Sequence, residues 1–114
     1  MRLIGQGGWG PRNRSIVGVW AVIQAGTTGK LHSSYNVASY TDNGAGDHTL
    51  TFVVPFGGAN EYACTFGTAA TNRTVTYQDE ATATAAGSLR IKTINSGNAL
   101  TDIDPTTVLC VGRR

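Results

Sequence analysis

Charged residues are scarce in this chain of 114 residues, where they make up 14% of the total. No segment repeats its apolar residues with the 3.6-residue period of an amphipathic helix. The longest apolar run, residues 16–23, is far too short for a membrane-spanning helix, and the N-terminus does not have the layout of a signal peptide. We therefore expect one soluble domain with almost no helix and no membrane partner, which is not exported by its own sequence.

Potential metal ligands are few and scattered. His32 and His48 stand apart, and the two cysteines do not form a C-x-x-C pair, so we predict neither a metal site nor a cofactor. We expect both histidines to face solvent. Cys64 and Cys110 lie among apolar residues in a chain without an export signal, so we expect free thiols, with a disulfide between neighbouring strands as the alternative.

A paired-carboxylate catalytic site is not indicated either. A glycosidase needs two carboxylates on either side of a cleft. The acids that could be nominated, Asp42 with Asp47 and Asp102 with Asp104, flank expected turns, where aspartate usually caps the backbone. We therefore predict no catalytic residues and a protein that is not an enzyme.

Glycine, threonine, alanine and valine are abundant instead, in short runs that alternate between apolar and polar residues. The clearest pattern is a hairpin over residues 33–54, with a reversal at 42–47 and an apolar face that includes Leu50 and Phe52. Further strands are expected at 15–23, 61–67, 73–78, 88–95 and 106–112. About seven short strands indicate an all-β, jelly-roll-like antiparallel β-sandwich over 15–114, preceded by an extended N-terminal arm over 1–14.

The first and last expected strands are apolar on both alternating faces, and such strands must be covered on both sides. One sandwich covers only one side, so we predict that the other side meets another subunit, in a homo-oligomer, expected to be a trimer. The predicted interface comprises Val17, Val19, Ile23, Leu109 and Val111.

Basic residues gather at the two ends of the chain. The ends carry five of the nine, whereas residues 15–112 hold four basic and seven acidic residues, a net charge of −3. We interpret Trp9, Arg12 and Arg14 as a docking arm for an acidic protein surface, although basic ends without a specific partner fit the pattern equally. No strand carries a basic stripe with interleaved aromatics, so nucleic acid is not an expected partner.

One motif resembles a known family. The run Ser34-Tyr35-Asn36-Val37, with Ser39, Thr41-Asp42-Asn43-Gly44, Gly46-Asp47, Thr49 and Phe52, resembles the core of a small β-domain that recurs in tailed-bacteriophage virion proteins, often at tail-fibre ends. The resemblance spans roughly residues 18–112. This chain departs from the family pattern at Glu61, which interrupts an Ala-Asn-aromatic step, and it lacks a long N-terminal stalk.

The resemblance implies a non-enzymatic structural protein on the virion exterior, assembled in the host cytoplasm, as part of a tail-fibre or host-adsorption apparatus. A capsid decoration protein on the major capsid lattice is the alternative, and a glycan-processing enzyme ranks last. Partners would be itself, other tail or capsid proteins, and host surface glycan. Candidate glycan contacts are Tyr40, Asn43 and Asn98, because sugars bind stacking faces and amides.

Overall fold

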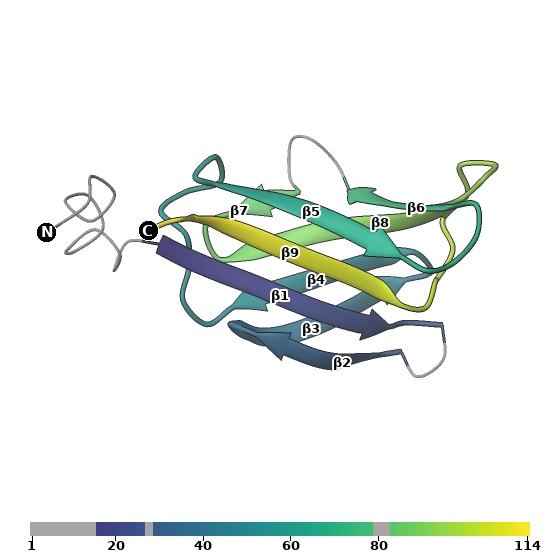
Figure 1. Ribbon diagram of the computed structural model, residues 1–114, viewed down its shortest axis with the longest axis horizontal. Helices are drawn as coiled ribbons and strands as arrows, with labels where there is room; N and C mark the ends of the chain where they lie inside the picture. Colours follow the sequence, from purple (N-terminus) through teal and green to yellow (C-terminus); the bar gives the residue numbers. More distant parts are fainter. Residues whose placement is uncertain (1–15, 27–28, 79–82) are drawn as a thin grey trace, which may run out of the picture.

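The computed structural model describes residues 16–26, 29–78 and 83–114, which form two antiparallel sheets packed as a sandwich (Figure 1). Sheet A has the strand order β2-β1-β9-β5, and sheet B has the order β3-β4-β8-β6, with β7 paired to β8. The strands are β1 (Ile16–Gln24), β2 (Lys30–Tyr35), β3 (Val37–Gly44), β4 (Asp47–Phe52), β5 (Tyr62–Thr68), β6 (Arg73–Tyr77), β7 (Thr84–Ala85), β8 (Ser88–Asn95) and β9 (Thr106–Arg113).

The predicted all-β antiparallel sandwich is confirmed, and the described residues form nine strands instead of about seven. The described part of the chain contains no helix that could cross a membrane. The predicted N-terminal arm over 1–14, with its docking residues Trp9, Arg12 and Arg14, lies outside the described residues.

The core lies between the two sheets and follows the alternation of each strand. Leu50, Leu89 and Ile91 are fully buried, as their period-two pattern predicts. Tyr62, Cys64, Phe66, Val75 and Tyr77 pack against this core from the edge strands β5 and β6. The core is therefore continuous from the centre of the sandwich to its β5–β6 edge.

The hairpin over residues 33–54 is more complex than predicted. Its reversal is confirmed, since β3 pairs with β4 and both Gly44 and Gly46 have positive φ. Its first arm is not one strand, however, because the chain bends at Asn36, which has a φ of 62°. The segment before Asn36 pairs with β1 in sheet A, and the segment after it belongs to sheet B.

The Asn36 side chain holds this corner in place. Its amide donates hydrogen bonds to the Gly18 carbonyl at 3.2 Å and the Val54 carbonyl at 3.0 Å, and its carbonyl oxygen accepts one from the Val54 N–H at 2.7 Å. One side chain thus connects β1, the corner and the segment after β4.

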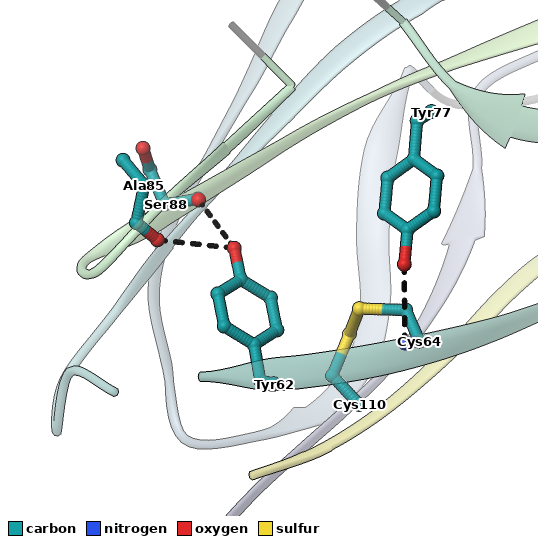
Figure 2. The surroundings of a disulfide bond; sticks show 6 residues. All are labelled: Tyr62, Cys64, Tyr77, Ala85, Ser88 and Cys110. Carbon is teal, nitrogen blue, oxygen red and sulfur yellow. Dashed lines mark hydrogen bonds between the residues drawn. A yellow bond between two sulfur atoms is a disulfide. The ribbon is translucent and has the colours of Figure 1, made fainter. Parts of the chain in front are cut away.

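The two cysteines are bonded, so the expectation of free thiols was wrong. Cys64 on β5 lies directly opposite Cys110 on β9, with their Cα atoms 4.0 Å apart, and the sulfur atoms form a disulfide (Figure 2). The physical reason is the register of the two strands, which makes the cysteines direct cross-strand neighbours on the inner face of sheet A. Nothing in the spacing of two isolated cysteines gives that register.

Candidate functional site

The predicted oligomer interface is divided between the two faces of sheet A. Val17, Val19 and Ile23 are buried in the core, and Val19 is only 1% exposed, so their assignment to an outer interface was wrong. Leu109 and Val111 do face outward, at 48% and 54% exposure. The register explains the division, since Val19 pairs with the buried Cys110, whereas Trp20 pairs with Leu109.

The outward residues of sheet A include an apolar surface that crosses β2, β1 and β9 and reaches Ala63 on β5. Trp20 on β1 lies opposite Tyr35 on β2 and Leu109 on β9, and Leu109 in turn lies opposite Thr65 on β5. We call this surface the apolar face and define it by its exposed members Ile16, Trp20, Tyr35, Ala63, Leu109 and Val111.

The centre of the apolar face carries no formal charge. Among the outward residues of these four strands, Lys30 and Arg113 mark the two ends, and no Asp, Glu, Lys or Arg lies between them. Gly18, opposite Val111, contributes no side chain, so part of the face is flat. A flat and uncharged surface of this kind can be dehydrated without burying a charge.

The outer face of sheet B has the opposite character. Its outward residues include Asp47, Arg90 and Lys92 among several threonines. Arg90 donates two hydrogen bonds to Asp47, from Nε at 2.8 Å and from Nη2 at 2.6 Å. This contact lowers the pKa of Asp47 to about 2. The sandwich therefore has one polar outer face and one apolar outer face.

The apolar face continues into a hollow at its edge. This hollow has a volume of about 410 Å³ and is lined by Ile16, Val17, Gly18, Tyr35, Asn36, Val53, Val54 and Arg114. Val53 and Val54 are themselves exposed there. The surface available for docking therefore extends from the centre of sheet A to the Asn36 corner.

A second, larger groove of about 660 Å³ lies near the β5–β6 edge, with Asn60, Tyr62, Tyr77 and Lys92 in its lining. Figure 2 shows that both tyrosine hydroxyls have structural partners: that of Tyr62 bonds the Ala85 and Ser88 carbonyls, and that of Tyr77 accepts the Cys64 N–H. Burial raises the pKa of Tyr62 to about 12. These tyrosines tie the edge strand of sheet A to sheet B.

The candidate glycan contacts do not form one exposed site. Tyr40 was expected to be an exposed aromatic on a loop. Instead it packs against the core, and its hydroxyl is hydrogen-bonded to Nδ1 of His48 at 2.8 Å. Asn43 donates to Asp47 and Thr49 within its own hairpin. Asn98 has a φ of 65° and occupies a turn.

His48 was expected to face solvent, and this was wrong: the residue is fully buried, whereas His32 is exposed as expected. The alternation of β4 turns His48 inward together with Leu50 and Phe52. Its Nε2 has no hydrogen-bond partner and lies 3.6 Å from Oδ1 of Asp102. Burial lowers the pKa of His48, while the charges of Asp102, Asp42 and Asp47 oppose that effect.

The aspartates that flank turns hold the backbone, as predicted. Asp42 accepts the Gly44 N–H at 3.0 Å within the hairpin. Asp102 accepts the Gly46 N–H at 2.7 Å, and Asp104 accepts the Gly26 N–H at 2.8 Å, so these two connect loops that are distant in sequence. Residues 16–26, 29–78 and 83–114 contain no group of three side chains that could hold a metal ion.

Comparison with known proteins finds no matching family, curated protein or solved structure. Sequence reasoning identified two of the six members of the apolar face, Leu109 and Val111. It missed Tyr35 and Ala63, and also Ile16 and Trp20, which occupy the other alternating set of β1.

Proposed function

We propose that this chain is a non-enzymatic structural protein of a tailed-bacteriophage virion, displayed on the exterior as part of the tail-fibre or host-adsorption apparatus. The observation that carries the proposal is the motif over residues 34–52, which resembles a β-domain of such virion proteins. No ligand chemistry is needed to explain the motif, since its residues build the Asn36 corner, β3, the glycine turn and β4.

Two features of the fold support a place on the outside of a particle. The Cys64–Cys110 disulfide suits an oxidising environment, and virion surfaces are among the places where disulfides persist. The apolar face supplies a surface by which a small sandwich can join a larger assembly. Neither feature requires turnover of a substrate.

The test is to locate and count the chain in purified virions of the phage that encodes it. Antibody labelling in electron micrographs, combined with quantitative mass spectrometry, gives its position and copy number. We expect labelling on the tail at a few to a few dozen copies per particle. Hundreds of copies on the head would instead support capsid decoration, and absence from the virion would refute both roles.

The enzymatic alternative has a separate test. Purified protein is incubated with host envelope polysaccharide, and released reducing sugar is measured. We expect no release, together with binding of the labelled protein to host cells. Release of sugar would overturn the non-enzymatic assignment.

A further inference from the structure

We propose that the apolar face of sheet A binds the same face of a second copy of this chain. The inference goes beyond the virion role and does not depend on it. It rests on the composition, shape and size of the face, each of which matches what a sheet-on-sheet contact between two copies requires.

Composition favours a contact through sheet A. Trp20, Leu109 and Val111 are each between 42% and 54% exposed, and no charged side chain lies among them. Packing through sheet B would instead bury Asp47, Arg90 and Lys92, and desolvating charges is costly. Dehydration of the outer side of sheet A is therefore more favourable in free energy than dehydration of the outer side of sheet B.

The shape of the face suits packing against another sheet. Two sheets pack at a separation of about 10 Å when their facing side chains interdigitate. On β1 the large Trp20 alternates with Gly18, and across the strands Leu109 and Val111 lie beside the small residues Thr65 and Ala63. Large residues of one copy can thus enter the low positions of the other.

The size of the face is sufficient for a specific contact. Four strands at a spacing of about 4.8 Å, between six and nine residues long, give the whole outer side of sheet A, polar residues included, a footprint of roughly 500 Å² per copy. Two copies would bury about 1,000 Å², which is the lower end for a biological interface. The hollow of about 410 Å³ beside Ile16 and Tyr35 adds surface of mixed character, with Val53 and Val54 beside Asn36 and Arg114. We therefore expect an association that depends on protein concentration.

The composition of the apolar face favours a second copy of this chain as its partner. The face offers neither acids nor a central basic cluster with which to select a charged partner, whereas an apolar face is complementary to itself. A self-complementary patch closes about a twofold axis, so the face-to-face contact gives a dimer in place of the trimer expected from sequence.

The experiment compares three full-length proteins by sedimentation velocity over a hundredfold range of concentration. The wild type should shift from monomer to dimer as concentration rises. Leu109→Lys places a charge at the centre of the contact and should weaken association by at least about tenfold. Thr74→Lys, on the outward side of β6 in sheet B, should associate like the wild type.

Fluorescence gives an independent readout of the same contact. Trp9→Phe leaves Trp20 as the only tryptophan, because the chain has two. Its emission should move to longer wavelength on dilution, as the dimer dissociates. A wild type that stays monomeric at every concentration, a trimer, or a dimer that Leu109→Lys leaves intact would each overturn the proposal.

Discussion

His48 is a polar, ionisable residue in a fully buried position. Its hydrogen bond at Nδ1 goes to the Tyr40 hydroxyl. Burial also raises the pKa of Tyr40, so the pair is neutral at physiological pH. The neutral form costs less desolvation free energy than a charged one would in this enclosed site, where Nε2 of His48 has no hydrogen-bond partner.

Acid should therefore destabilise the protein through His48. Because its folded-state pKa is lowered, the unfolded chain binds the proton more readily, and stability falls as the pH drops below about 6.5. Urea unfolding at pH 7.5, 6.5 and 5.5 should show this loss. His48→Gln should reduce the pH dependence of the unfolding free energy by up to one proton. An unchanged pH dependence in His48→Gln would contradict this assignment.

At the scale of elements, the Asn36 corner decides where β2 ends and β3 begins. The residue combines a left-handed backbone with three hydrogen bonds from its side chain. Few side chains other than asparagine can do both, because most non-glycine residues are strained at positive φ.

Substitutions at Asn36 should separate these two contributions. Asn36→Ala loses the hydrogen bonds and adds backbone strain, so we expect a destabilisation of roughly 2–4 kcal/mol. Asn36→Gly loses the same hydrogen bonds but adopts the positive φ without strain, so it should be destabilised less than Asn36→Ala. Urea denaturation of both variants measures the difference. Equal losses would show that the backbone conformation contributes little.

The sequence predicts strands well where one face is polar and poorly where both are apolar. In β4 and β8 threonine, arginine and lysine mark the outer side, so Leu50, Leu89 and Ile91 could be assigned to the core correctly. His48 of β4 is the exception, because a lone histidine was assigned to the solvent side against the alternation of its strand. In β1 both alternating sets are apolar, and only pairing with β9 shows that Val19 faces inward and Trp20 outward. The sheet change at Asn36 depends on one residue's φ, which alternation does not encode.

At the scale of the whole molecule, the disulfide closes a long segment of chain. Cys64 and Cys110 are 46 residues apart, and closing a loop of that length stabilises a fold by up to about 4 kcal/mol. The bond joins β5 at the edge of sheet A to β9, so it also fixes the strand that carries Leu109 and Val111.

Removing the disulfide should thus destabilise the entire sandwich. We expect Cys64→Ala with Cys110→Ala to lower the free energy of unfolding by about 2–4 kcal/mol. Addition of a reductant should do the same to the wild type and have no effect on the double variant. If the reductant leaves the wild-type unfolding midpoint unchanged, the thiols do not form this bond in solution.

The position of the disulfide also governs how the domain resists a mechanical pull. Ile16 on β1 lies opposite Arg113 on β9, so tension between these two strand ends separates their ladder one pair at a time (Figure 1). Tension on the C-terminal side can draw out only Val111 to Arg113 before it reaches Cys110, which is covalently anchored to β5. Tension on the β1 side meets no such anchor. A tether attached through the last strand would therefore withstand a peeling force that an attachment through the first strand would not.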